Sequence, residues 1–326
     1  MNIKDLIKDQ LRKTDIKGSQ DNQLIKELLE YLADEKEKDI NRRLLRDLVS
    51  KYALAEKRLR SLNNELIEKD QRIDIDLKAA AEIQKSLLPQ KTFFEENLEI
   101  AWKFEPCEHM GGDIFNIFKI DAEHLGIYML DVSGHGVPAA MVTVSVSQFL
   151  QQNLAQLLQN SSIMAPAEVL NALDKEFPFE RFNNFFTITY FIINVKNGDT
   201  TYSNAGHPFP ILLNKSETIE LLKKGGPTVG IGDFDDLDDG KIKFEEGQLK
   251  MKPGDKLFIY TDGIVEYQND KEEFYGDDRF YNSLKAQKAE SVTNMIDQCI
   301  NSLMEFGNNT NPQDDITLLG LELNNR

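Results

Sequence analysis

The spacing of the apolar positions changes near residue 89. Between residues 42 and 88 there is neither glycine nor proline, and apolar side chains recur every three or four residues. This spacing predicts one long amphipathic helix, about 70 Å in length at 1.5 Å per residue. Pro89 cannot continue the backbone hydrogen bonds of a helix, so we expect the helix to end there.

The long helix carries a heptad repeat with two seam positions. One seam position holds Leu45, Tyr52, Leu59, Leu66, Ile73, Ala80 and Leu87, and the other holds Leu48, Ala55, Leu62, Lys69, Asp76 and Ile83. The repeat predicts a two-stranded coiled coil, and therefore a homodimer, that is weakened where Lys69 and Asp76 enter the seam. A bundle formed with the first forty residues of the same chain is the alternative. Residues 1–41 have a similar spacing, which predicts a small helical regulatory or dimerisation element.

Beyond Pro89 the pattern becomes one of short strands grouped apart from helices. We expect strands at 98–104, 114–120, 124–132, 185–195, 199–204, 209–213, 242–249, 256–261 and 315–323, and helices near 137–159, 165–176, 277–285 and 291–306. The turn Lys196-Asn197-Gly198-Asp199 is a hairpin signal, and strict alternation of strand and helix is missing. These features predict an α+β fold built on antiparallel sheets over residues 90–326, preceded by a helical linker at 42–89.

Charge is distributed unevenly between these regions. The net charge is −17; residues 1–90 carry 19 basic and 18 acidic side chains, whereas residues 91–326 carry 19 and 37. An acidic surface of this kind repels phosphate backbones and anionic lipid, so we expect neither a nucleic acid nor a membrane as partner. With two cysteines, no signal-peptide pattern at the start and no apolar run of about 18 residues, the chain is expected to be cytoplasmic.

Aspartates follow or precede apolar strands at four separated places. Asp113 follows Gly111-Gly112, Asp131 ends the run 125–130, Asp262 ends the run 256–261, and Asp314-Asp315 precede Ile316-Thr317. The glycines beside these acids allow tight turns and close backbone approach. Asp314 and Asp315 point to opposite sides of a strand, so only one of them should face a shared site. Oxygen ligands suit Mg²⁺ or Mn²⁺, and a pair of such ions activates water for attack on phosphorus.

Alternative interpretations exist for several of these motifs. Asp131 could simply cap the helix that follows it. The pentapeptide Gly111-Gly112-Asp113-Ile114-Phe115 is similar to the signature of diguanylate cyclases, but that interpretation leaves the later aspartates unexplained. His135 is expected to hydrogen-bond its own turn, and the acidic stretch at 232–240 is expected to be a solvated loop, with a separate cation site as the alternative.

Seven ordered motifs between residues 79 and 323 carry a resemblance to a known family. They are the segment 81–89, the turn 111–113, the run 131–136, Phe186-Thr187-Ile188-Thr189-Tyr190, Asn204-Ala205-Gly206-His207-Pro208, Gly226-Pro227-Thr228-Val229-Gly230, and the acids at 262 and 314–317. In this order they resemble the PPM metal-dependent serine/threonine protein phosphatases, in the branch named for the sporulation phosphatase SpoIIE. The implied fold is a pair of antiparallel sheets sandwiched between helices, with the phosphatase domain at residues 90–326.

The resemblance also implies roles for single residues. Asp131 would bridge two divalent cations, Mn²⁺ or Mg²⁺. Asp113 and the Val132 carbonyl would bind one cation, and Asp262 with Asp314 the other, with Asp315 as the substitute for Asp314. Relatives with this pattern act on phosphoserine or phosphothreonine, commonly in an anti-sigma-factor antagonist of the STAS fold, which is the expected substrate class.

Two departures from the family pattern, and one alternative function, accompany this prediction. Asn116 replaces a usual aspartate, and Lys103 replaces a usual arginine, so any phosphate contact at Lys103 would be that of a point charge. The alternative function is that of a non-catalytic scaffold for partner switching. Loss of metal ligands would favour a scaffold, but every expected aspartate is present.

Overall fold

The computed structural model describes residues 39–89, 98–160, 164–216, 218–231, 244–308 and 310–324. Residues 1–38, which hold most of the expected N-terminal element, lie outside this set, and so does the acidic stretch at 232–240. The chain divides into two compact units, Met1–Asp76 and Leu77–Arg326.

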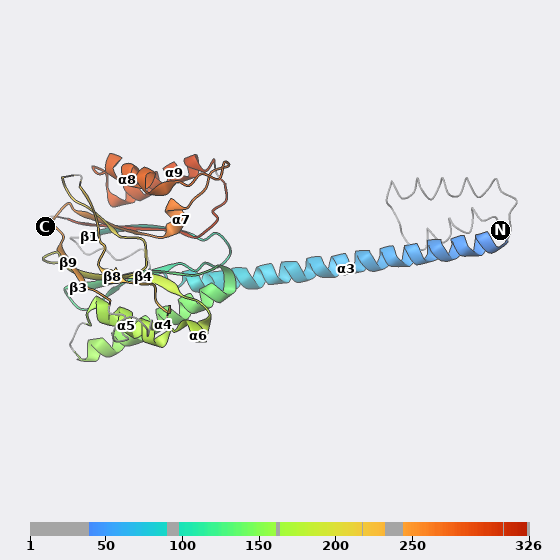
Figure 1. The fold of residues 1–326 in the computed structure, drawn as a ribbon, viewed down its shortest axis with the longest axis horizontal. Helices are drawn as coiled ribbons and strands as arrows, with labels where there is room; N and C mark the ends of the chain where they lie inside the picture. The colour runs from blue at the N-terminus through green and yellow to red at the C-terminus, as the bar shows by residue number, and fades with distance from the viewer. Residues whose placement is uncertain are drawn as a thin grey trace. The chain divides into compact units, whose positions relative to one another are not determined.

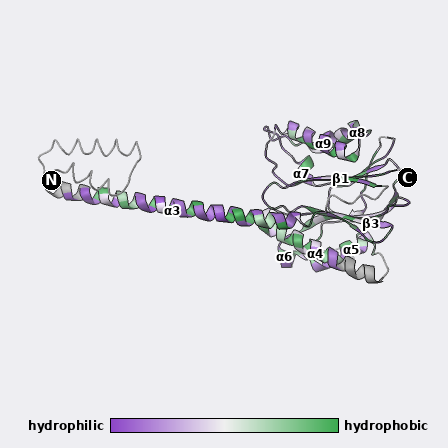
Figure 2. Ribbon diagram, turned by 180° about the vertical axis from the view of Figure 1, so that it is seen from behind, coloured by the Kyte–Doolittle hydropathy of each residue, from purple (hydrophilic) through white to green (hydrophobic). Residues whose placement is uncertain are grey.

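The predicted long helix is present as α3 (Asp39–Lys85), a single helix of 47 residues. It ends four residues before Pro89 because the chain tightens into a turn, in which the Leu87 N–H donates to the Gln84 carbonyl at 3.0 Å. Apolar positions recur between hydrophilic ones along α3 (Figure 2). Several of its large apolar side chains are exposed, namely Leu48, Leu59, Leu62, Leu66 and Ile73. The coiled coil that would cover them remains a prediction. Within the described residues, α3 and the other helices are too short or too polar to span a bilayer.

Two β-sheets form the centre of the second unit. The first sheet has five strands in the order β1-β11-β10-β6-β7, and its neighbouring strands are antiparallel. Its strands are β1 (Leu98–Glu105), β6 (Ile211–Leu213), β7 (Ile219–Leu221), β10 (Lys256–Tyr260) and β11 (Ile316–Leu323). The last strand of the sequence therefore lies between the first strand and β10.

The second sheet follows the order β2-β3-β4-β5-β8, with β9 also paired to β5. Its strands are β2 (Ile114–Lys119), β3 (His124–Val132), β4 (Phe186–Asn194), β5 (Asp199–Ala205), β8 (Gly225–Gly226) and β9 (Gly247–Lys250). The short pair β5 and β8 is parallel, whereas the other pairs of this sheet are antiparallel. The predicted α+β fold with antiparallel sheets is thus confirmed, apart from this one pair.

Helices cover the outer face of each sheet (Figure 1). The first sheet is covered by α8 (Gly276–Ala286) and α9 (Val292–Phe306), and the second by α4 (Gly136–Asn160), α5 (Pro166–Glu176) and the short α6 (Phe179–Phe182). Ser291 caps α9, because its side chain accepts a hydrogen bond from the Asn294 N–H. Pro166 stands in the first turn of α5, where its missing N–H leaves no helical bond unmade.

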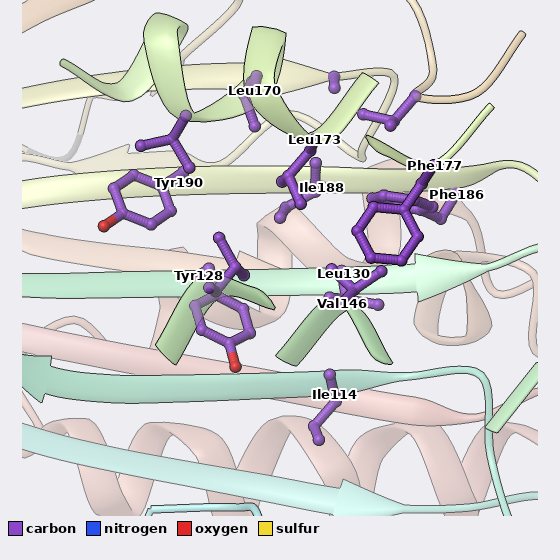
Figure 3. Packing of buried hydrophobic residues seen from close by; sticks show 14 of the residues in the cluster. Ile114, Tyr128, Leu130, Val146, Leu170, Leu173, Phe177, Phe186, Ile188 and Tyr190 are labelled. Carbon is purple, nitrogen blue, oxygen red and sulfur yellow. The ribbon is translucent and has the colours of Figure 1, made fainter. Parts of the chain in front are cut away.

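Alternation of side chains along the strands creates three apolar layers. Phe115, Met129, Phe191 and Leu319 belong to the layer between the two sheets. The opposite faces of the strands pack against helices, and Figure 3 shows one such layer, in which Leu130, Ile188 and Leu173 come together from β3, β4 and α5. The third layer joins the first sheet to α8 and α9. These layers fix the strand ends that carry the predicted site.

Replacing Phe191 by alanine should lower the stability of the second unit by about 3–5 kcal/mol, because a large side chain would leave a cavity between the sheets. Phe191 is fully buried, and its ring stacks on that of Tyr202 with centroids 5.4 Å apart. Phe274, which is 53% exposed, offers a matched control. We expect Phe274→Ala to change stability by less than about 0.5 kcal/mol. Urea denaturation measures the stability of both variants. Equal midpoints would contradict the placement of Phe191 in the layer between the two sheets.

Candidate metal centre

Four strand ends bring the predicted aspartates together. Asp113 directly precedes β2, and Asp131 is the penultimate residue of β3, which pairs with β2. In the other sheet, Asp262 follows β10, and Asp314 and Asp315 precede its partner β11. The two groups meet across the sheets, because Thr317 of β11 donates a hydrogen bond from Oγ1 to Asp113 Oδ2 at 2.6 Å. The sandwich therefore gathers at one end acids that are as many as 202 residues apart in the sequence.

Asp113 is the most deeply buried of these acids, with 2% of its surface exposed. Its pKa is raised well above the usual value, first by burial and then by the negative charges of Asp131 and Asp315. The Thr317 hydroxyl donates a hydrogen bond to this carboxylate, and together with the nearby Thr261 hydroxyl it partly opposes the rise in the pKa. The Asp113 side chain is thus held firmly in one orientation.

The pKa values of the other acids are raised for the same reasons. Burial, followed by the charges of Asp262, Asp314 and Asp315, raises the pKa of Asp131 to about 8. Burial and the charge of Asp314 raise the pKa of Asp262 to about 6. The pKa of Asp314 is also raised, first by partial burial. Burial is the largest cause of each rise, and the charge contributions show that these carboxylates interact electrostatically at one end of the two sheets.

Two glycines let the backbones of the site approach each other. A Cβ on Gly112 would lie 2.6 Å from the Val132 carbonyl oxygen, and one on Gly263 would lie 2.1 Å from the Asp315 carbonyl oxygen. The Val132 N–H donates to the Gly112 carbonyl at 3.3 Å, and the Thr143 hydroxyl donates to the same oxygen at 2.7 Å. The Val132 carbonyl is therefore next to the turn that carries Asp113, as the predicted ligand set requires.

Asp314 and Asp315 have different surroundings. Asp315 is buried, and its two carboxylate oxygens accept hydrogen bonds from the Cys107 N–H at 2.8 Å and the Asp113 N–H at 3.2 Å. Asp314 is exposed, and its Oδ1 accepts a bond from the Asp315 N–H at 2.8 Å. The Asp315 side chain thus ties down the loop before β2, which leaves Asp314 as the freer of the two carboxylates for a cation.

Alanine at these two positions should separate stability from metal binding. Asp315→Ala leaves two backbone N–H groups without their acceptor, so we expect a loss of about 1–3 kcal/mol in the metal-free protein. Asp314→Ala should cost less than about 1 kcal/mol and weaken Mn²⁺ binding by about 10- to 100-fold. Denaturation in chelator and calorimetric titration with Mn²⁺ measure the two effects. The opposite ranking would make Asp315 the ligand.

Other polar residues near the cluster have partners of their own. His135 is exposed, and its Nδ1 lies 3.1 Å from Glu108 Oε1. His207 is buried next to the Thr187 hydroxyl, 2.8 Å from its Nδ1, and burial lowers its pKa to about 3. Cys107 lies beside Asp315, and burial together with that charge raises the pKa of its thiol to about 12. Lys103 pairs with Glu105 at 2.8 Å.

Threonines are the part of the site that sequence reasoning missed. Thr317 belongs to the motif that contains Asp314, and Thr261 directly precedes Asp262. The Thr317 N–H donates to the Thr261 hydroxyl at 3.1 Å, so the two residues tie the end of β10 to the start of β11. A threonine directly before Asp262 and another two residues after Asp315 were the signal that could have found them.

The donor set of this centre fits hard divalent cations. It consists of carboxylate oxygens whose pKa values are raised first by burial and then by one another's charges, together with a nearby backbone carbonyl. Bound cations would relieve this repulsion and keep the carboxylates ionised. One donor atom from each of Cys107, Asp314 and Asp315 also lies within 4.8 Å of the other two. Oxygen donors dominate the cluster, as Mn²⁺ and Mg²⁺ prefer.

Two facing sheets, helices on both outer faces and acids gathered at one end define the PP2C class of fold. The SiaA-PP2C domain of Pseudomonas aeruginosa shares it, with a TM-score of 0.66 and 20% sequence identity over 78% of this chain and 99% of that domain. At this level of identity the likeness concerns the fold alone.

The chain belongs to the SpoIIE family, because the family model described as Stage II sporulation protein E matches residues 121–324. Among curated relatives, phosphoserine phosphatase RsbP of Bacillus subtilis is 28% identical over 59% of this chain and 45% of RsbP. Phosphoserine phosphatase RsbU of the same organism is 26% identical over 77% of this chain and 71% of RsbU. The chain thus spans less than half the length of RsbP.

Proposed function

We propose that the chain is a divalent-cation-dependent phosphatase acting on phosphoserine or phosphothreonine in proteins. The observation that carries this proposal is the group of mutually repelling carboxylates at the ends of β2, β3, β10 and β11. Membership of a family with relatives named phosphoserine phosphatases supports it. When bound, a pair of Mn²⁺ or Mg²⁺ ions would activate a water molecule for in-line attack on phosphorus.

Each residue has a role in this proposal. Asp131 would contact both cations, Asp113 and the Val132 carbonyl one of them, and Asp262 with Asp314 the other. Asp315 would hold the loop that carries Asp113, and it is the substitute ligand if Asp314 proves dispensable. Thr317 keeps the Asp113 carboxylate oriented through its 2.6 Å hydrogen bond. Because Asp314 is exposed, a phosphorylated side chain can approach the centre from that side.

Hydrolysis of a phosphoserine peptide by the purified chain tests the activity. We expect turnover with Mn²⁺ or Mg²⁺, loss of turnover in excess chelator, and recovery when the cation is restored. Calorimetric titration of the metal-free chain separates this function from that of a scaffold without catalysis. Absence of both turnover and cation binding would favour the scaffold.

A STAS-domain anti-sigma-factor antagonist is the substrate class that we propose, in a cytoplasmic partner-switching pathway. Kinship with RsbP and RsbU supports it, and the two free cysteines agree with a reducing compartment. The test compares dephosphorylation of a folded phosphoserine STAS domain with that of a peptide containing the same phosphosite. We expect the folded domain to be preferred, and equal rates would remove the proposed specificity.

We also propose that α3 pairs with its copy in a second chain. Support comes from the exposed apolar seam, in which Leu59 and Leu66 are 66% and 65% exposed. Sedimentation measures the outcome: the double variant Leu59→Asp, Leu66→Asp should be monomeric, whereas Asn64→Asp, outside the seam, should remain dimeric. A wild-type monomer at all accessible concentrations would refute the pairing.

A further inference from the structure

Gln84 is a buried polar side chain near the C-terminal end of α3, and its amide binds a single residue of the loop before β2. Gln84 Nε2 donates to the Gly111 carbonyl oxygen at 2.7 Å, and the Gly111 N–H donates to Gln84 Oε1 at 3.2 Å. The side chain is 4% exposed. Two hydrogen bonds of opposite direction fix the peptide groups on both sides of Gly111.

Asp315 holds the same loop from its other side. A Cβ on Gly111 would lie 2.0 Å from Asp315 Oδ2, so this backbone and that carboxylate are in direct contact. The Asp315 carboxylate also accepts the N–H groups of Cys107 and Asp113. Residues 107–113 are therefore clamped between a side chain of α3 and a side chain at the start of β11, and Asp113 lies at the end of the clamped segment.

The apolar packing around Gln84 reaches the second acid-bearing segment. Ala81, one turn earlier on α3, is buried in a small cluster with Met110 and Ala140. Met110 precedes Gly111, and Ala140 lies in α4, the helix that follows the turn after Asp131. Small side chains at these contacts let the backbones come close. The last turns of α3 thus contact the loop that carries Asp113 and the helix that follows Asp131.

We propose that Gln84 is a positioning residue of the metal centre, which sets its affinity for divalent cations by holding loop 107–113 in place. This inference rests on the proposed function, because it takes the carboxylate cluster to be a cation site. Gln84 belongs to a helix that runs unbroken from Asp39 to Lys85, so a signal that shifts this helix would act on the loop through the Gln84 amide.

The experiment compares Gln84→Met, which keeps the length of the side chain and removes both hydrogen bonds, with Gln71→Met on the exposed face of α3. Full-length proteins are stripped of metal, titrated with Mn²⁺ by calorimetry, and followed by amide hydrogen exchange. We expect Gln84→Met to bind Mn²⁺ about 10- to 100-fold more weakly. Exchange should accelerate within residues 107–113 of the metal-free protein and stay unchanged in β4 and β5. Gln71→Met should match the wild type.

Three outcomes would overturn the proposal. These are an Mn²⁺ affinity within about twofold of the wild type, unchanged exchange at 107–113, and faster exchange throughout both sheets, which would make Gln84 a residue of general stability. If Gln84→Met does not fold, Gln84→Glu, which keeps the acceptor for the Gly111 N–H and loses the donor, takes its place with the same expected result. Failure of the wild type to hydrolyse phosphoserine would refute the proposed function alone, because affinity and exchange are measured without turnover.

Discussion

Asp131→Asn should lower phosphatase activity by a factor on the order of 10³ or more, because the central carboxylate of the cluster would lose the charge that binds both cations. Asp131 is the acid whose pKa responds to the charges of three others, Asp262, Asp314 and Asp315, which places it in the middle of the group. Initial rates at saturating Mn²⁺, with a phosphoserine peptide as substrate, measure the effect. The same variant should melt at a higher temperature than the wild type in chelator, because a neutral amide replaces a carboxyl whose pKa is raised first by burial and then by neighbouring charges.

Asp297→Asn provides the matched control. Asp297 lies on the exposed side of α9, and its substitution makes the same chemical change away from the cluster. Its activity and melting temperature should equal those of the wild type. If Asp131→Asn kept more than about a tenth of the wild-type rate, the assignment of a bridging carboxylate would be wrong.

The stability of the metal-free protein should rise as the pH falls from about 8 towards 5. The pKa values of Asp131 and Asp262 are raised to about 8 and about 6 in the folded chain, above the value of 3.8 for an ordinary aspartate. The folded state therefore binds more protons than the unfolded state over this range, and its stability falls as the pH rises. Thermal melting in chelator at several pH values measures this slope.

Mn²⁺ should reverse the dependence, because the cations favour the ionised carboxylates. At a free concentration of 100 times the dissociation constant, one bound ion adds about 2.7 kcal/mol, which corresponds to an increase of roughly 5–10 °C in Tm for a unit of this size. Asp131→Asn should flatten the slope measured in chelator. A wild-type stability that increased with pH in chelator would contradict the repulsion between the carboxylates.

Regular elements and their order could be predicted from the sequence because each has a local signal. The strand predicted at 124–132 matches β3, and the helix predicted at 291–306 matches α9 within one residue. Four short elements were missed, namely α6, α7 (Asp262–Val265), β7 and β8, whereas the three-residue β6 lies within the strand predicted at 209–213. Their conformation depends on tertiary contacts, as for β8, which pairs with β5 through Asn204 and Ala205.

The acids of the site could be selected from the sequence because each follows or precedes an apolar strand. The different roles of these acids could not be predicted from the sequence, because they depend on hydrogen bonds between distant segments. Asp314 and Asp315 are adjacent and chemically identical, but Asp315 is buried and accepts backbone N–H groups from a loop about 200 residues earlier, whereas Asp314 is exposed. Gln84 is a similar case: the motif at 81–89 that contains it could be recognised in the sequence, but its hydrogen bond to Gly111 could not be predicted.

The contacts at Gly112 and Gly263 limit how this centre can change during evolution. At both positions the space for even a methyl group is already filled by a carbonyl oxygen of the neighbouring segment. Exchanging an acid for its amide alters charge and keeps volume, whereas any residue larger than glycine here would push apart the ends of neighbouring strands, β2 and β3 at Gly112 and β10 and β11 at Gly263. Substitution at these two points is therefore limited by side-chain bulk, whereas at the aspartates it is limited by charge.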